Sequence, residues 1–180
     1  MPRSLSHSAP RRRPMFAALA ALLAAPFVTG AASYSNTFDA RVLAAHNAER
    51  AALGIPPLRW NPELVESAHA WGQYLATSGR FEHAPERRMD PEGENLWAGT
   101  RGYYSPEAMV DGWIREKRYF KPGAFPNNST TGHVADVGHY TQVMWRDTVQ
   151  VGCALSRGRD EDVLVCRYKN AGNYRGERPF

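Results

Sequence analysis

The sequence predicts a single α+β domain that follows an N-terminal leader. Four segments carry apolar residues at helical spacing, and two β-branched segments near the C-terminus flank a polar turn, as in a β-hairpin. A chain of 180 residues has room for one ordinary domain with a substantial core and a short appendage. The sequence contains no internal repeat and no sign of a second domain.

Residues 1–32 have the layout of a secretory signal peptide. Arg3 and residues 11–13 form a basic head, residues 15–28 are almost entirely apolar, and small residues follow. The apolar run of about 14 residues is shorter than the ~20 needed to cross a bilayer, so a transmembrane anchor is the less favoured alternative. We therefore predict a signal peptide, then one domain over 33–180, no membrane span, and a secreted, extracellular protein.

Removal of the leader changes the charge balance of the protein. Residues 1–32 hold four of the 22 Lys and Arg and none of the 18 Asp and Glu, which leaves 18 against 18 in the rest of the chain. A balanced surface gives no reason to expect nucleic acid or an anionic membrane as a partner.

Two helices are predicted in the first half of the domain. The first runs from Phe38 to Leu53, and the second begins at Asn61-Pro62-Glu63, where Asn caps and Pro takes the first helical position, and ends at Gly79. His46 and Arg50 are four residues apart and share one face of the first helix. A structural hydrogen-bond cluster is the preferred interpretation of this pair, and a ligand role is the alternative.

A third helix is predicted to begin at Ser105-Pro106-Glu107, by the same capping logic. Trp113 lies on its apolar face, and Glu116 flanks that face three residues later. A loop rich in Pro, Gly and Asn follows over 121–138, and loops of that length are usually functional or mobile. A short fourth helix is predicted over 140–146.

The two cysteines, Cys153 and Cys166, are predicted to form a disulfide. The signal peptide places them in an oxidising compartment, and a hairpin that turns near Arg159 and Asp160 sets them opposite each other. Such a bridge stabilises by roughly 3 kcal/mol in the chain-entropy model. Two reduced core thiols are the alternative.

Familiar catalytic motifs are missing from the sequence. It contains no His-Glu-x-x-His, no Gly-x-Ser-x-Gly and no phosphate-binding loop. The residues that remain as candidates for chemistry are scattered, and their spacing alone does not group them: His83, Glu94, Glu116 and His139.

Four segments resemble the signature motifs of the CAP superfamily, which comprises cysteine-rich secretory proteins, antigen 5 and plant pathogenesis-related class 1 proteins. They occur in the order of that family and span roughly residues 38 to 180: His46-Asn47-Ala48-Glu49-Arg50, Gly93-Glu94-Asn95-Leu96, Gly138-His139-Tyr140-Thr141-Gln142, and Cys166-Arg167-Tyr168 with Gly172-Asn173-Tyr174. The resemblance implies a three-layer α-β-α sandwich with helices on both sides of a central antiparallel sheet. The sequence departs from the family pattern at 79–81, shortly before His83, where it has no cysteine.

The same resemblance implies which residues line a cleft and which hold the fold. The family's cleft contains two histidines and two glutamates, which match His83, Glu94, Glu116 and His139. A structural role is expected for the other motif residues: His46, Asn47, Arg50, Asn95 and Trp145.

Two carboxylates that share a cleft need a compensating positive charge, from protonated histidines or from a divalent cation. Imidazole nitrogens suit zinc, nickel or copper. Our hypothesis is that His83 and His139 ligate a divalent metal, with zinc as the candidate, while Glu94 and Glu116 bond water or the histidines. Two protein ligands make a weak, open site. The alternative is a buried polar network that only fixes loops.

The expected function is a secreted binding module and not an enzyme. A groove rimmed by Trp97, Tyr103, Tyr104 and Tyr140 would take a small or lipid-like ligand. One alternative is a metal-dependent hydrolase of peptides or esters with a glutamate of the cleft as base. The other is a structural extracellular domain with a vestigial cleft. A monomer or a weak dimer is expected.

Overall fold

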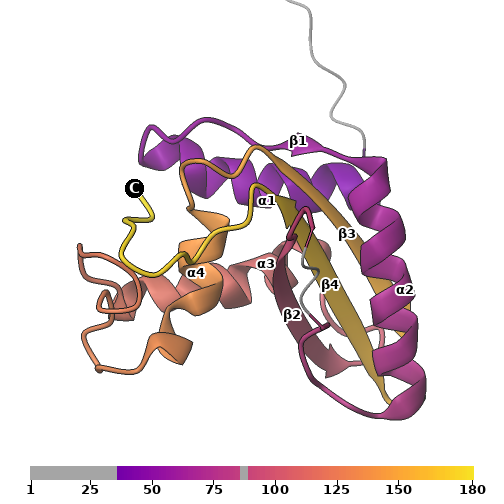
Figure 1. Cartoon of the computed structure of the whole chain (residues 1–180). Coiled ribbons are helices and arrows are strands. Elements are labelled where there is room, and N and C mark those ends of the chain that lie inside the picture. Colours follow the sequence, from indigo (N-terminus) through magenta and orange to yellow (C-terminus); the bar gives the residue numbers. More distant parts are fainter. Residues whose placement is uncertain (1–35, 86–88) are drawn as a thin grey trace, which may run out of the picture. The chain divides into compact units, whose positions relative to one another are not determined.

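A four-stranded sheet forms the centre of the computed structural model, which describes residues 36–85 and 89–180 (Figure 1). Its strands are β1 (Arg59–Trp60), β2 (Gly93–Thr100), β3 (Gln150–Arg157) and β4 (Glu161–Lys169), in the order β1-β3-β4-β2. β4 therefore lies between β2 and β3 and is antiparallel to both. The predicted signal peptide falls outside the described residues and stays a prediction.

The edge strand β1 departs from the antiparallel sheet that we expected. Arg59 and Trp60 run parallel to β3, opposite Gln150 and Val151. Only these two residues pair, because Asn61 caps the next helix and turns the chain out of the sheet. The sheet is thus mixed, with antiparallel pairing among its three long strands.

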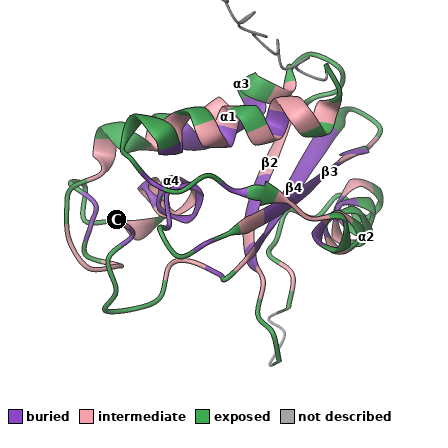
Figure 2. Ribbon diagram, turned by 90° about the horizontal axis from the view of Figure 1, so that it is seen from above, coloured by how far each residue is buried: buried purple, intermediate pink, exposed green. Residues whose placement is uncertain are grey.

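Helices cover both faces of this sheet (Figure 2). α2 (Pro62–Ser78) packs on one face, where Ala68 and Leu75 meet Leu96 and Val165. The other face carries α1 (Phe38–Ala52), α3 (Pro106–Ile114) and α4 (Gly138–Val143), which share a larger core cluster with β3 and β4. The three-layer α-β-α sandwich is confirmed.

A glycine sets the distance between α2 and the sheet. A Cβ placed on Gly152 of β3 would lie 2.5 Å from Asn61 O and 2.6 Å from Val65 N, both atoms of the helix backbone. Any side chain at this position would therefore push the first turn of α2 away from β3.

The predicted helix starts are confirmed in detail. Asn61 Oδ1 accepts from the Glu63 amide at 2.8 Å, and Ser105 Oγ accepts from the Ala108 amide at 3.2 Å. Each cap satisfies an amide that the helix leaves free. Gly79 ends α2 with a φ of 68°, in the left-handed region that glycine adopts without strain.

The third and fourth helices end earlier than the sequence indicates. α3 stops at Ile114 and continues as a short 3₁₀ helix, Arg115–Tyr119, which carries Glu116. α4 covers Gly138–Val143 instead of 140–146. The carbonyls of Val143 and Trp145 both accept from Arg50 Nη1 at 2.9 Å, so a residue of α1 takes carbonyls that a longer helix would use.

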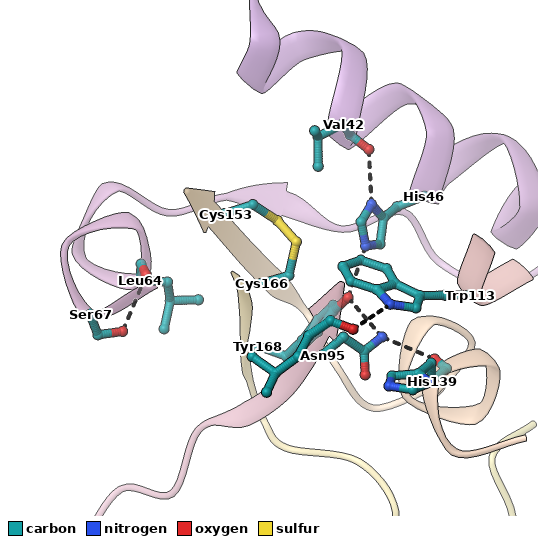
Figure 3. Close-up of a disulfide and its surroundings, with 11 residues drawn as sticks. Val42, His46, Leu64, Ser67, Asn95, Trp113, His139, Cys153, Cys166 and Tyr168 are labelled. Atoms are coloured by element: carbon teal, nitrogen blue, oxygen red, sulfur yellow. Dashed lines mark hydrogen bonds between the residues drawn. A yellow bond between two sulfur atoms is a disulfide. The ribbon is translucent and has the colours of Figure 1, made fainter. Parts of the chain in front are cut away.

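The predicted hairpin and disulfide are confirmed. β3 and β4 are adjacent, Cys153 stands opposite Cys166 in their register, and the two form a disulfide (Figure 3). Both cysteines are buried in the core cluster beneath α1 and α3. In the described part of the chain, no helix is both long and apolar enough to cross a bilayer.

Candidate functional site

His46 lies in the core and uses both ring nitrogens within the protein (Figure 3). Nδ1 donates to the Val42 carbonyl at 2.8 Å, and Nε2, 2.9 Å from the Tyr168 hydroxyl, accepts from it. Burial lowers the pKa of His46 to about 4, and it raises the pKa of Tyr168. His46 is therefore a neutral connection between α1 and β4, with no nitrogen left for a ligand.

Arg50 and Asn47 fix the segments that follow them. The Arg50 guanidinium donates to four backbone carbonyls, those of Pro56, Val143, Trp145 and Thr148. Asn47 exchanges two hydrogen bonds with the backbone of Leu58, at 2.8 and 3.0 Å. Both residues thus connect α1 to segments far along the chain. Trp145 is buried, and its carbonyl accepts from Arg50.

Asn95 connects β2 to α4. Its Nδ2 lies 3.1 Å from the His139 carbonyl and 3.3 Å from the Tyr168 hydroxyl, and the side chain is buried (Figure 3). Asn95 therefore fixes the position of the backbone that carries His139.

The first histidine–glutamate pair joins the loop after α2 to β2. His83 Nδ1 donates to Glu94 Oε1 at 2.6 Å, and the Ala84 amide donates to the same oxygen at 3.1 Å. On the other side of Glu94, Arg167 Nη2 is 2.8 Å from Oε2, in an ion pair that lacks hydrogen-bond alignment. The hydrogen bond to Glu94 raises the pKa of His83. The Glu94 side chain is 8% exposed and that of His83 is 66% exposed. A buried carboxylate therefore holds an imidazole that lies mostly in solvent.

The second pair joins α4 to the 3₁₀ helix after α3. His139 Nδ1 donates to Glu116 Oε1 at 2.6 Å, and Oε2 accepts from the amides of His139 and Tyr140 at 3.0 and 3.1 Å. The imidazole also stacks on Trp113, with ring centroids 6.2 Å apart and planes 17° apart. His139 is accordingly fixed by its ring, its backbone and its helix.

Both pairs share one arrangement. In each, a carboxylate accepts from Nδ1, and Nε2 is the nitrogen that remains for a ligand. This is the orientation that carboxylates impose on metal-binding histidines.

The structure joins the four cleft residues in two pairs, and neighbouring residues of β2 contact each pair. Glu94 and Asn95 are consecutive in β2, so their side chains point to opposite faces of the sheet. Glu94 bonds His83, Asn95 bonds the His139 backbone, and Gln142 of α4 lines the cavity that contains His83 and Glu94. Both pairs therefore lie at the start of β2. Across residues 36–85 and 89–180, no group of three or more His, Cys, Asp and Glu is placed to hold a metal ion.

A cavity of about 550 Å³ lies beside the first pair. His83, Glu94 and Arg167 form its polar wall, while Pro91 and Tyr174 contribute apolar surface. The volume falls within the range of small-molecule sites.

The expected aromatic groove is wrong as a single feature. Tyr140 is buried, 3% exposed, and packs against Phe120 and Phe180 with centroids 5.6 and 6.2 Å apart. The other three aromatics form a separate edge-to-face series at 5.0 and 4.9 Å: Trp97, Tyr104 and Tyr103. The helical position of Tyr140 turns its ring toward the C-terminal residues, which the local sequence does not reveal.

Two residues next to the site were missed by sequence reasoning as contributors to it. Arg167 contacts Glu94, and Gln142 lines the same cavity and accepts from the Gly172 amide at 2.9 Å. A signal existed for Arg167, because a charge inside the apolar run from Val163 to Tyr168 needs a partner when that strand is buried. Gln142 gave no comparable signal.

An α-β-α sandwich with two carboxylate-bound histidines, one in a loop and one in a short helix, defines the class of this protein. The chain belongs to the cysteine-rich secretory protein family, whose CAP model matches residues 43–168.

Among its relatives, pathogenesis-related protein PR-1 of Medicago truncatula is 35% identical over 148 residues, 81% of this chain and 81% of that protein. Pathogenesis-related protein 1A of Nicotiana tabacum is 36% identical over 139 residues, 77% of this chain and 78% of that protein.

Solved structures share the fold at lower identity. The crystal structure of NaASP2 with Zn2+ is similar with a TM-score of 0.69 and 20% identity, over 83% of this chain and 88% of that chain. BmVAL-1 is similar with a TM-score of 0.67 and 19% identity, over 84% of this chain and 85% of that chain. At such identities the likeness concerns the fold alone.

Proposed function

We propose that this protein is a secreted binding module of the family that holds a divalent metal weakly, through Nε2 of His83 and of His139. The observation that carries the proposal is the shared arrangement of the two pairs, with a carboxylate 2.6 Å from each Nδ1. A carboxylate in this position fixes the tautomer and makes Nε2 a better donor to a metal. The metal would be zinc or a similar ion that prefers imidazole.

The donor set fits a weak site and not a tight one. Structural zinc sites use four protein ligands and catalytic sites usually use three, whereas this chain offers two imidazoles. Glu94 and Glu116 are already used by the histidines and by backbone amides, so they serve to orient the ligands. NaASP2, which shares the fold, was crystallised with Zn2+, and this makes zinc the first ion to test.

The hydrogen bonds that Glu94 and Glu116 accept also favour a binding module over a hydrolase. A general base needs a lone pair that can take a proton from water. Each carboxylate of the pairs accepts at least two hydrogen bonds, and Glu94 is also beside Arg167. These contacts occupy the oxygen lone pairs that a general base would offer to water.

The small or lipid-like ligand would occupy the cavity beside the first pair. Ala84, Pro85 and Pro91 supply apolar wall, and His83 and Arg167 supply polar groups at one side. The wall is more polar than that of a typical small-molecule pocket, so a ligand with a polar end and an apolar end fits it best. The basic head and apolar run of residues 1–32 and the disulfide support secretion.

The test is titration calorimetry with zinc on the protein purified after export, at pH 7.5 and pH 5.5. We expect saturable binding with a Kd of about micromolar or weaker at pH 7.5 and its loss at pH 5.5, because protons compete for imidazole. His83→Ala and His139→Ala should abolish the heat. His69→Ala is the matched control, because His69 is exposed on α2, and it should bind as the unchanged protein does.

Two outcomes would contradict the proposal. Equal binding by the histidine variants would place the metal elsewhere. No binding by the unchanged protein, with both variants merely less stable, would make the pairs a structural network. Organic extraction of the same preparation, followed by mass spectrometry, tests the cavity for a lipid-like ligand independently of zinc.

A further inference from the structure

The loop that carries His83 runs back along α2 before it enters β2. Gly79 ends the helix with a φ of 68°, and the loop then contacts α2 through Glu82 and β2 through His83. The chain leaves α2 at the lower part of the view in Figure 1, whereas β2 begins beside the C-terminal end of β4, where Gly93 lies opposite Tyr168. Two elements can therefore fix this loop, α2 on one side and β2 on the other.

On the helix side, Glu82 is the residue that is held. Trp71 Nε1 donates to the Glu82 backbone carbonyl at 3.1 Å, although the two residues are eleven positions apart. Tyr74 stacks on Trp71 with centroids 4.7 Å apart, and its hydroxyl reaches Glu82 Oε1 at 3.4 Å. Arg80 lies 3.4 Å from the same carboxylate oxygen. We call Trp71, Tyr74 and Glu82 the loop latch.

On the strand side, the loop is held through Glu94. The carbonyl to which Trp71 donates belongs to the peptide group that supplies the amide of His83. The indole bond and the His83–Glu94 bond thus act on successive residues of the loop.

The two histidines differ in how much else fixes them. His139 lies in a helix, stacks on Trp113, and its backbone amide is bonded to Glu116. His83 is in a loop with a mostly exposed ring and has Glu94 as its hydrogen-bond partner. The orientation of His83 therefore depends on the backbone of its loop.

We propose that Trp71 is a positioning residue for His83, and that through the loop latch helix α2 sets the direction of the His83 imidazole. The inference deepens the proposed metal site and rests on it for its effect on zinc. The effect of Trp71 on the orientation of His83 in the metal-free protein does not depend on the proposed metal site.

The variant that tests the latch is Trp71→Phe, which keeps an aromatic ring against Tyr74 and removes the indole N–H. The matched control is Trp97→Phe, because Trp97 is a partly buried tryptophan on β2 that packs against Tyr104. Tyr74→Phe removes only the long hydroxyl contact from an exposed ring and should have a smaller effect in the same direction.

The first measurement uses metal-free, isotope-labelled protein and NMR. In Trp71→Phe we expect the ring resonances of His83 and the amides of His83 and Ala84 to shift, while the ring of His139 stays in place. Trp97→Phe should leave His83 unchanged. If His83 has the same resonances in Trp71→Phe as in the unchanged protein, the positioning role of Trp71 is wrong, whatever the zinc titration gives.

The second measurement is zinc titration of the same variants. We expect roughly tenfold weaker binding in Trp71→Phe, in the range found when a group that orients a metal ligand is removed, and a change below twofold in Trp97→Phe. Equal weakening in both would show general loosening and overturn the positioning role. If the unchanged protein binds no zinc, the proposed metal site fails, and the shift of His83 in the metal-free protein still decides the latch.

Discussion

Three histidines of the domain differ in what holds their two ring nitrogens. His46 is buried and both of its nitrogens are used. His83 and His139 each give Nδ1 to a glutamate and keep Nε2 for a ligand. Histidine therefore connects core elements in α1 and is a candidate ligand in the loop after α2 and in α4, and the neighbours of each ring determine which role it has.

At this scale we predict an acid-sensitive stability that originates at His46. Burial lowers its pKa from 6.5 to about 4, so the unfolded chain binds more protons between these two pH values. The free energy of unfolding should be fully retained above pH 6.5 and should fall by on the order of 3 kcal/mol as the pH drops to 4. Urea unfolding at several pH values measures this.

The variant His46→Leu separates this effect from other titrations. It should lower the free energy of unfolding by about 2 kcal/mol at pH 7, because Tyr168 loses a buried hydrogen-bond partner. It should also flatten the pH dependence between 6.5 and 4. A slope as steep as that of the unchanged protein would mean that another group causes the acid sensitivity.

Single residues also show where sequence reasoning succeeded and failed at the site. The motifs identified His83, Glu94, Glu116 and His139, because each has a short and specific sequence context. They did not reveal that these residues form two pairs, since the partners lie 11 and 23 positions apart and meet only in the folded chain. The role of Arg167 likewise depends on the register between β2 and β4, in which it faces Glu94.

At the scale of elements, the packing of α2 on β3 depends on the close approach at Gly152. Gly152→Ala would place a Cβ against two backbone atoms of the helix, which cannot move without shifting α2. We expect a loss of about 2 kcal/mol in the free energy of unfolding, typical of overpacking.

Gly112→Ala is the matched control for this prediction. Gly112 lies inside α3, and its added Cβ would meet Trp97 at an ordinary 3.4 Å. The same substitution should there be neutral or stabilise by up to about 1 kcal/mol, because alanine favours helix. Denaturant unfolding of both variants checks the contrast, and equal effects would show that the helix–strand distance at Gly152 is not tight.

The starts of the elements could be read from the sequence more easily than their ends. Asn61, Ser105 and Gly79 act through bonds to residues within a few positions, so the local pattern suffices. The end of α4 depends on Arg50, which lies 93 residues away from Val143. The parallel pairing of β1 likewise depends on where β3 arrives.

At the scale of the whole molecule, the disulfide joins the two central strands beneath the larger helical layer. Its reduction, or the double substitution Cys153→Ala and Cys166→Ala, should lower the free energy of unfolding by about 3 kcal/mol. Unfolding curves with and without reductant measure this, and the double variant should not respond to reductant. An unchanged midpoint on reduction of the native protein would rule out a stabilising role for the bridge.

The position of β4 determines the order in which the molecule can be completed. β2 pairs with β4 and not with β3, although β2 precedes β3 in the chain. A chain that emerges from the ribosome with its N-terminus first can form α1 and α2 early, but the sheet lacks its middle until residues 161–169 are available. Contacts between distant segments of this kind slow folding. The nascent protein should therefore stay open and sensitive to proteases until its last strand appears, and should then close in a single late step.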